Sequence, residues 1–317
     1  MSEQDKSNGW EREVLEKVLL ASVTEQRRAR RWGVAFKLFL VIYAGLALWL
    51  VVDPLDGKTG HDSKQHTAVI DISGPIADGT ETNAEKVRDG IKNALEDSAT
   101  KGIILKMNSP GGSPVQSAYL WEYIRQVKSE RPNLPIVAVV SDLCASGCYY
   151  VAAAADKIFV NASSVVGSIG VIMNGFGFVD AMNKVGVERR ALTAGEHKAL
   201  LDPFSPVSEF EKTHIQQNVL NSIHQQFIDA VRKGRGERLK ESPDMFSGLV
   251  WTGDDGIRLG LVDALGDVHT VAKSVIGADK LVNFTQKERL IDRVAHRIGT
   301  SLGMALQTAI GSGWILR

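Results

Sequence analysis

Two short segments contain residues whose types and order suit acyl-transfer chemistry. The first, residues 145–158, holds Ser146 followed by Gly147 and a run of small and aromatic residues. The apolar run 136–140 predicts a strand, residues 141–145 predict a loop, and the residues after Ser146 predict a helix. Ser146 is then expected on a sharp turn that opens this helix. Unpaired N–H groups at a helix N-terminus favour a negative charge developing on oxygen.

The second segment lies upstream, in residues 108–114. It holds Gly111 and Gly112, follows the predicted strand 102–107 and precedes a predicted helix that begins near Ser113. Glycines leave backbone N–H groups accessible, so this loop suits an oxyanion hole. A Pro-Gly-Gly run alone is also typical of an ordinary turn. Its combination with the serine segment favours the chemical interpretation.

A serine nucleophile needs a base, and residues 195–203 offer two candidates, His197 and Lys198. A lysine acts as a general base when burial removes its charge. Most of the 37 Lys and Arg residues are expected on the surface, so an isolated lysine is a weak signal. If this segment is extended, the two adjacent side chains point to opposite sides, and only one of them faces the serine.

Together these segments resemble the bacterial signal peptide peptidase A family. Its members are membrane-bound serine peptidases with a Ser/Lys dyad on a crotonase-like (ClpP-like) α/β fold. The resemblance covers about residues 66–270 and rests on runs in the family's order and spacing, namely 108–112, 145–150, 167–171 and 195–198, with 250–253 and 259–266 as its closing segment. Several motifs in the right order are more specific than any one of them.

The resemblance implies a role for each matching residue. Ser146 corresponds to the nucleophile and Lys198 to the general base. The backbone N–H of Gly111 or Gly112 corresponds to the oxyanion donor, and Ser168 to a serine that orients the lysine. The resemblance selects Lys198 over His197 as the base, and it implies no metal and no cofactor.

Two residues depart from the family pattern. Cys148 stands where a small residue is usual, and His197 stands where an aromatic residue is usual. The chain has two cysteines, Cys144 and Cys148, which is too few for a disulfide scaffold. We expect both to be reduced and buried, and we expect no zinc site because no further Cys/His cluster supplies ligands.

The N-terminal part predicts a membrane anchor. Residues 32–52 are apolar apart from Lys37 and, as a helix, would span roughly 30 Å. Arginines precede this run and acidic residues follow it, so the N-terminus is expected in the cytoplasm and the catalytic part in the periplasm, outside the bacterial inner membrane. A cleaved signal peptide is the alternative, but the charged leader is long and a small-x-small cleavage site is missing.

The remaining pattern predicts one catalytic domain. Strand and helix signals alternate from residue 68 onward, which favours an α/β sheet covered by helices. Residues 209–233 read as a long amphipathic helix that stops at Gly234. The predicted organisation is a cytoplasmic segment (1–31), a transmembrane anchor (32–52), a linker (53–65), a peptidase domain (66–285) and an amphipathic tail (286–317).

The sequence therefore predicts a membrane-anchored serine endopeptidase that hydrolyses cleaved signal peptides and similar apolar peptides. Following the resemblance, we also expect a homo-oligomer with active sites shared between subunits. With 37 acidic and 37 basic residues, the net charge of zero argues against nucleic acid as a partner. The alternatives are a crotonase-like acyl-CoA enzyme and an inactive peptide-binding or membrane scaffold of the same fold.

Overall fold

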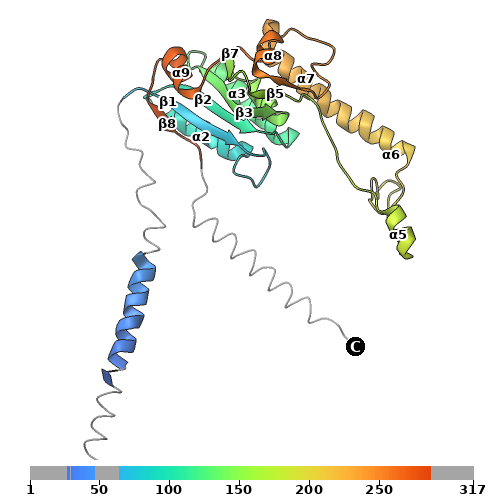
Figure 1. The fold of residues 1–317 in the computed structure, drawn as a ribbon, viewed down its shortest axis with the longest axis horizontal. Helices are drawn as coiled ribbons and strands as arrows, with labels where there is room; N and C mark the ends of the chain where they lie inside the picture. Colours follow the sequence, from blue (N-terminus) through green and yellow to red (C-terminus); the bar gives the residue numbers. More distant parts are fainter. Residues whose placement is uncertain (1–26, 29, 47–63, 287–317) are drawn as a thin grey trace, which may run out of the picture. The chain divides into compact units, whose positions relative to one another are not determined.

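A parallel sheet forms the centre of the fold in the computed structural model, which describes residues 27–28, 30–46 and 64–286 (Figure 1). The described residues 64–286 all belong to one compact unit. Its strands are β1 (His66–Ser73), β2 (Thr100–Ser109), β3 (Ile136–Ala145), β4 (Lys157–Val160), β5 (Val165–Gly167), β6 (Val250–Thr252), β7 (Ala264–Leu265) and β8 (Leu281–Asn283).

Helices connect and cover these strands. They are α2 (Ala84–Glu96), α3 (Pro114–Glu130), α4 (Gly147–Ala152), α5 (Val179–Val185), α6 (Glu209–His214), α7 (Asn221–Arg235), α8 (Gly253–Arg258) and α9 (Val268–Val271), with the π-helical segments η1 (Ile215–Leu220) and η3 (Ala272–Ile276) and the 3-10 turn η2 (Gly236–Arg238). The alternation of strands and helices confirms the predicted mixed α/β class.

The sheet forks at β3. Its central order is β6-β5-β3-β2-β1-β8, and β4 also pairs with β3 and then with β7. This is possible because β3 is long: Val137–Val139 pair with β4, whereas Leu143–Ala145 pair with β5. All of these pairings are parallel except that of β5 with β6.

Strand β3 extends further than the sequence predicts. Residues 141–145 were expected to form a loop, but they belong to the strand, because Cys144 pairs with Ser109 of β2 and Leu143 pairs with Val165 of β5. Neighbouring strands override the weak local strand signal of this polar stretch. As a consequence, Ser146 follows the end of the strand directly.

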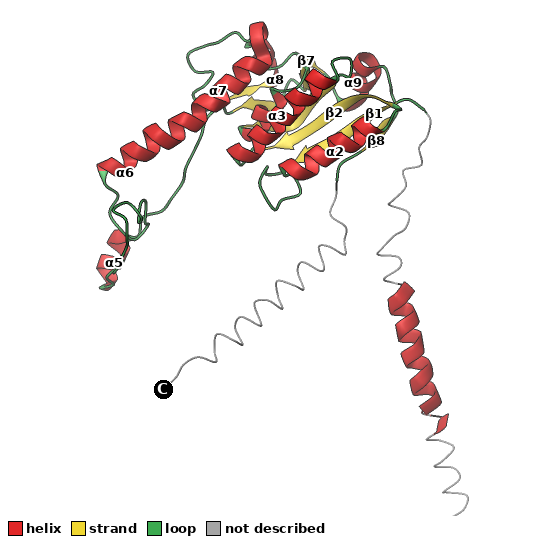
Figure 2. Cartoon of the chain, turned by 180° about the vertical axis from the view of Figure 1, so that it is seen from behind, coloured by secondary structure: helices red, strands yellow, loops and turns green. Residues whose placement is uncertain are grey.

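Both faces of the sheet are buried, as is usual for parallel strands. Ala68, Ile70 and Ile72 of β1 point into a core shared with α2, α3, α4 and α7, and Val69 points into a smaller core shared with α9 and η3. Figure 2 shows α2 and α3 lying across one face of the sheet. The alternation follows from the two-residue period of a strand.

A long helical stretch and an extended arm follow the sheet core. The stretch α6–η1–α7 runs from Glu209 to Arg235, which confirms the predicted helix but not its stop at Gly234. Gly234 instead packs against the Ala153 backbone, and the helix ends at Gly236, whose φ is 55°. We call residues 172–207 the arm; it carries α5 and extends away from the sheet beside the start of α6 (Figure 1).

The described part of the predicted anchor, residues 32–46, is helical. Its large apolar side chains are exposed, among them Trp32, Phe36 and Phe39. None of the helices in the described residues is long and apolar enough to cross a membrane. Residues 47–52 of the predicted anchor and residues 287–317 of the predicted tail lie outside the described residues.

Candidate active site

Ser146 occupies a sharp turn between β3 and α4. Its φ of 54° and ψ of −126° are rare for a residue with a side chain. The turn is held at the sheet because the Ser146 N–H donates to the Gly167 carbonyl at 2.8 Å. The side chain is half-buried and has no hydrogen-bond partner in the described residues. The hydroxyl therefore stands available at the carboxyl end of the central strand.

Gly111 lies directly against this turn. Its φ is 93°, and a methyl group on its Cα would lie 2.8 Å from Ser146 Cβ and 2.7 Å from the Ala145 carbonyl oxygen. No real side chain fits at those distances, so glycine is required at this position. The structure thus brings the glycine loop and the serine turn together, although more than thirty residues separate them in the sequence.

The two glycines of the loop differ in their N–H groups. The Gly111 N–H donates to the buried Ser109 hydroxyl at 3.1 Å. The Gly112 N–H has no partner within the described residues. The neighbouring hydrogen bonds use other groups: the Ile76 N–H donates to the Gly111 carbonyl, and the Ser113 N–H donates to the Ile76 carbonyl. Of the two glycines, Gly112 is therefore the one whose N–H is available to donate to a substrate oxygen.

A second donor was not among the predicted site residues. The Gly147 N–H, in the first turn of α4, also lacks a partner within the described residues. A methyl group on Gly147 would lie 3.2 Å from the Gly112 nitrogen, so the two backbone segments are close neighbours. Two neighbouring unpaired N–H groups beside a serine suit a developing oxyanion. The sequence signal that could identify Gly147 as a donor is its position, because it directly follows the serine and is the first residue of the helix.

Ser168 lies next to the backbone that holds the serine turn. It follows Gly167, the residue whose carbonyl accepts from Ser146, and its own N–H donates to Leu249 at 2.7 Å. Its φ of 52° turns the chain away from β5. The side chain is partly exposed and makes no hydrogen bond in the described part of the chain. Ser168 is thus near Ser146 without a partner for its hydroxyl.

The structure does not place Lys198 with the other site residues. It lies in the arm, between α5 and α6, with an exposed side chain. Its ammonium group makes no hydrogen bond or ion pair with any other described residue. Helix α4, which follows Ser146, instead packs among α3, β2, β3 and α7. Within one chain, the candidate nucleophile and the candidate base belong to separate parts of the fold.

The segment around Lys198 is not extended, so the argument that adjacent side chains point to opposite sides does not apply. The Lys198 N–H donates to the Gly195 carbonyl and the Leu200 N–H donates to the His197 carbonyl, each at 3.1 Å, so the segment forms successive turns. The His197 ring stacks on Phe210 of α6 with centroids 4.5 Å apart. The His197 ring therefore packs on α6.

Polar contacts fix the rest of the lysine-bearing loop. The Phe204 N–H and the Arg189 guanidinium donate to Asp202, and they hold the pKa of that carboxyl below its ordinary value. Helix α6 begins with a reciprocal cap in which the Ser208 hydroxyl accepts from the Glu211 N–H and Glu211 accepts from the Ser208 N–H. The loop is thus anchored on both sides of Lys198.

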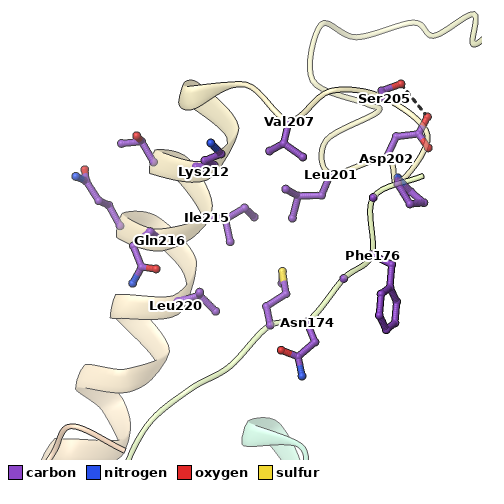
Figure 3. Close-up of a pocket in the computed structure, with 16 residues that line it drawn as sticks. Asn174, Phe176, Leu201, Asp202, Ser205, Val207, Lys212, Ile215, Gln216 and Leu220 are labelled. Carbon is purple, nitrogen blue, oxygen red and sulfur yellow. Dashed lines mark hydrogen bonds between the residues drawn. The ribbon is translucent and has the colours of Figure 1, made fainter. Parts of the chain in front are cut away.

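A pocket of about 830 Å³ lies between the loops of the arm and the helical stretch α6–η1. Leu201, Val207 and Ile215 point toward one another across it, and Asp202 and Ser205 form a hydrogen-bonded pair at its rim (Figure 3). Ser146 is not among its lining residues. This concavity is therefore an apolar hollow of the arm and not the surroundings of the nucleophile.

Cys144 and Cys148 form a disulfide, which corrects the expectation that both are reduced. The sharp turn at Ser146 brings their Cα atoms to 5.1 Å, within the usual range for a disulfide. The sequence predicts the sharp turn at Ser146, but it places residues 141–145 in a loop, so it does not predict that the end of a strand and the start of a helix bring the two cysteines together. Among the described residues, no group of three or more His, Cys, Asp or Glu side chains is placed to hold a metal ion.

A family model and several protease-named relatives indicate one family. The profile of Peptidase family S49 matches residues 128–282. Over 231 residues, the chain is 30% identical to Protease 4 of Haemophilus influenzae, a match that covers 71% of this chain and 36% of that protein. It is 27% identical over 281 residues to the chloroplastic serine protease SPPA of Arabidopsis thaliana, covering 86% of this chain and 39% of that protein.

A further relative has a different name. The chain is 39% identical over 214 residues to a Brucella abortus protein named Na(+)/H(+) antiporter NhaA, covering 67% of this chain but 29% of that protein. The match thus spans less than two thirds of each of these relatives. The name of the Brucella protein describes a much longer polypeptide, whereas the profile and the protease-named relatives agree with the serine and glycine motifs. The chain belongs to peptidase family S49.

Proposed function

We propose that this protein is a serine endopeptidase on a crotonase-like fold, with Ser146 as its nucleophile. One observation carries the proposal: Ser146 stands on a sharp turn with its hydroxyl unpaired among the described residues, beside the similarly unpaired N–H groups of Gly112 and Gly147. A nucleophile next to preorganised donors is the arrangement that acyl transfer requires. Family membership and the protease-named relatives support the same interpretation.

The proposed reaction proceeds through an acyl-enzyme. Neutral Lys198 accepts the proton of the Ser146 hydroxyl while Ser146 Oγ attacks the peptide carbonyl carbon. The carbonyl oxygen gains negative charge and accepts hydrogen bonds from the N–H groups of Gly112 and Gly147. The protonated lysine then donates its proton to the leaving amine as the C–N bond breaks. Water, deprotonated by the same lysine, releases the acyl group as a carboxylate.

We propose that Lys198 reaches Ser146 from a second copy of the chain. The support is that the arm carrying Lys198 is separate from the serine turn and presents many exposed apolar residues, such as Ile172, Phe176 and Leu192. None of the residues in α5, α6 or η1 is buried. Extended apolar surface of this kind is typical of an interface with another chain. Ser168 would then orient the incoming lysine.

We further propose that the protein is anchored in the bacterial inner membrane with its catalytic part in the periplasm. The described helical residues 32–46 expose apolar side chains, the run 32–52 is apolar in the sequence, and arginines precede that run. The Cys144–Cys148 disulfide supports an oxidising compartment for the folded domain. Substrates would be cleaved signal peptides and similar apolar segments, which become available beside that membrane.

The other candidate functions receive less support. An acyl-CoA enzyme of the crotonase type would use the same oxyanion donors but has no need of Ser146 or an apolar anchor. An inactive scaffold would have no reason to retain an unpaired serine beside two unpaired N–H groups. A peptidase accounts for all of these features.

The test is covalent labelling with a fluorophosphonate, which reacts with activated serines. Full-length protein in detergent should be labelled at Ser146, as identified by mass spectrometry of the modified peptide. The Ser146→Ala variant should lose both the label and the cleavage of a fluorogenic apolar peptide. Labelling at another serine, or unchanged cleavage by Ser146→Ala, would disprove the assignment.

A further inference from the structure

The Cys144–Cys148 disulfide encloses the candidate nucleophile. The two cysteines flank Ser146 at equal distances in the sequence, two residues before it and two after it. Cys144 is the penultimate residue of β3, and Cys148 is in the first turn of α4. Both are fully buried. The covalent bond therefore ties the end of the strand to the start of the helix across the reactive residue.

The turn that this bond closes needs support. A φ of 54° and a ψ of −126° are unfavourable for serine, and such conformations persist only where the surroundings over-determine them. One backbone hydrogen bond, from Ser146 N–H to Gly167, holds the turn from outside. Gly111 touches it without a side chain that could brace it. The Tyr150 N–H also donates to the Ser146 carbonyl at 3.0 Å, and the disulfide adds a covalent restraint between the two sides of the turn.

The position of the disulfide argues against a role in overall stability. A disulfide restrains the unfolded chain more when it closes a longer loop. Here the sequence separation is only 4, so the loop is very short. The surrounding core is also already closed, since Tyr149, Val151 and Ala152 of α4 are fully buried. The restraint thus acts locally, on the geometry of Ser146.

We propose that the Cys144–Cys148 disulfide positions Ser146 for catalysis and that its reduction switches the enzyme to a weakly active state. This inference rests on the proposed function of Ser146 as the nucleophile. Without the bond, Ser146 can relax toward ordinary backbone angles, and its hydroxyl then moves away from the N–H groups of Gly112 and Gly147. Cys144 and Cys148 act through the turn and do not touch the substrate.

The switch is a two-electron exchange with a dithiol reductant. A thiolate of the reductant attacks the sulfur of one cysteine, which breaks the protein S–S bond and forms a mixed disulfide. The second thiol of the reductant then displaces that cysteine. The protein ends with two thiols, having gained two electrons and two protons, and the reductant ends as a cyclic disulfide.

The experiment compares the oxidised protein with the same protein after dithiothreitol treatment, using full-length chains in detergent. The readouts are the rate of fluorophosphonate labelling at Ser146, the kcat and KM for an apolar peptide, and a thiol count. We expect labelling and kcat to fall by roughly 10²-fold on reduction, because a displacement of about 1 Å costs that much. KM should change little, and reoxidation should restore the activity.

The double variant Cys144→Ala/Cys148→Ala provides the matched control. The chain contains only 2 cysteines, so dithiothreitol can act on no other disulfide and must leave the variant unchanged. The variant should match the reduced wild type in labelling rate and remain folded by circular dichroism. If the thiol count shows that the bond resists reduction, the labelling rate of the double variant tests the proposal. If the variant fails to fold, the labelling rate of the reduced wild type tests it.

Two results separate the failure of this inference from the failure of the proposed function. If oxidised protein is labelled at Ser146 and the label rate stays within about twofold after loss of the bond, the positioning role is wrong and the peptidase assignment stands. If oxidised protein shows no labelling at Ser146, the peptidase assignment itself is wrong, and this inference falls with it.

Discussion

At the scale of single residues, the serine turn leaves no room for a side chain on Gly111. A methyl group there would press on Ser146 Cβ and on the Gly147 nitrogen, at 2.8 Å and 2.6 Å. We expect Gly111→Ala to displace the nucleophile and lower kcat/KM by at least roughly 10²-fold. Gly79→Ala is the matched control, because Gly79 also has a positive φ but open space around it. Equal activity of the two variants would contradict this prediction.

Ser168 offers a smaller and more specific effect. Its hydroxyl is unpaired within the described residues and lies beside the backbone that holds Ser146, so it can accept a hydrogen bond from an incoming lysine. We expect Ser168→Ala to lower kcat by roughly tenfold, the order of effect of losing one orienting hydrogen bond. The pH–rate profile, which should rise toward mildly alkaline pH for a lysine base, should also shift. Ser163→Ala, in a loop outside the site, serves as the control; an unchanged profile for Ser168→Ala would refute the orienting role.

At the scale of the elements, a buried ion pair joins α7 to the sheet. Arg235 is 1% exposed, and its guanidinium donates two hydrogen bonds to Asp263 at 2.8 and 3.0 Å. Asp263 also accepts from the Ile158 N–H of β4, and the Tyr149 hydroxyl of α4 donates to the nearby Leu261 carbonyl. The closing segment 259–266 thus connects α7, β4 and the helix behind the nucleophile.

Removing the carboxylate should unfold the domain more easily. Asp263→Ala leaves the buried Arg235 charge without its partner, which costs about 3–5 kcal/mol of unfolding free energy for pairs of this kind. Urea denaturation at neutral pH measures the loss. The control is Glu188→Ala, which breaks the exposed Arg190–Glu188 pair and should cost below about 1 kcal/mol. Similar losses for both variants would show that the buried pair contributes little.

The same pair predicts a pH dependence of stability. Burial raises the pKa of Asp263, but the hydrogen bonds and charge of Arg235 outweigh it and hold that pKa below the ordinary value. A carboxyl with a depressed folded-state pKa adds stability above its unfolded pKa, about 3.9, and loses it as the pH falls through the folded value. Wild-type protein should therefore lose stability below about pH 4 more steeply than Asp263→Ala in urea titrations at each pH.

The elements also show what the sequence can and cannot predict. Strands β1 and β2 and helices α2 and α3 follow directly from apolar periodicity, and α3 begins at Pro114 with Ser113 as its N-cap, close to the predicted start. The end of β3 does not, because residues 141–145 gain their strand conformation from pairing with β2 and β5. The sharp turn at Ser146 is predicted, but with residues 141–145 taken as a loop the sequence does not predict the approach of Cys144 to Cys148. Gly147 is not predicted because its N–H role depends on its place in the first turn of α4 beside Gly112, which only the fold shows.

At the scale of the whole molecule, the separation of Ser146 from Lys198 is the feature that sequence spacing alone does not reveal. The motif match names both residues, but only the fold shows that one lies at the sheet and the other in the arm. The exposed apolar residues of the arm and the hollow lined by Leu201, Val207 and Ile215 are expected to be covered when copies associate. A head-to-tail interface that passes each lysine to its neighbour would close into a ring.

Complementation between inactive chains tests this arrangement. Neither Ser146→Ala nor Lys198→Ala should cleave peptide alone, because nucleophile and base act as a unit. Co-assembled at equal amounts, they should recover about a quarter of the wild-type activity, since random neighbours in a ring give that share of sites both intact residues. Ser146→Ala chains mixed with the Ser146→Ala/Lys198→Ala double variant contain no intact serine and should stay inactive. If differently tagged chains co-purify and the first mixture also stays inactive, the two residues must act within one chain.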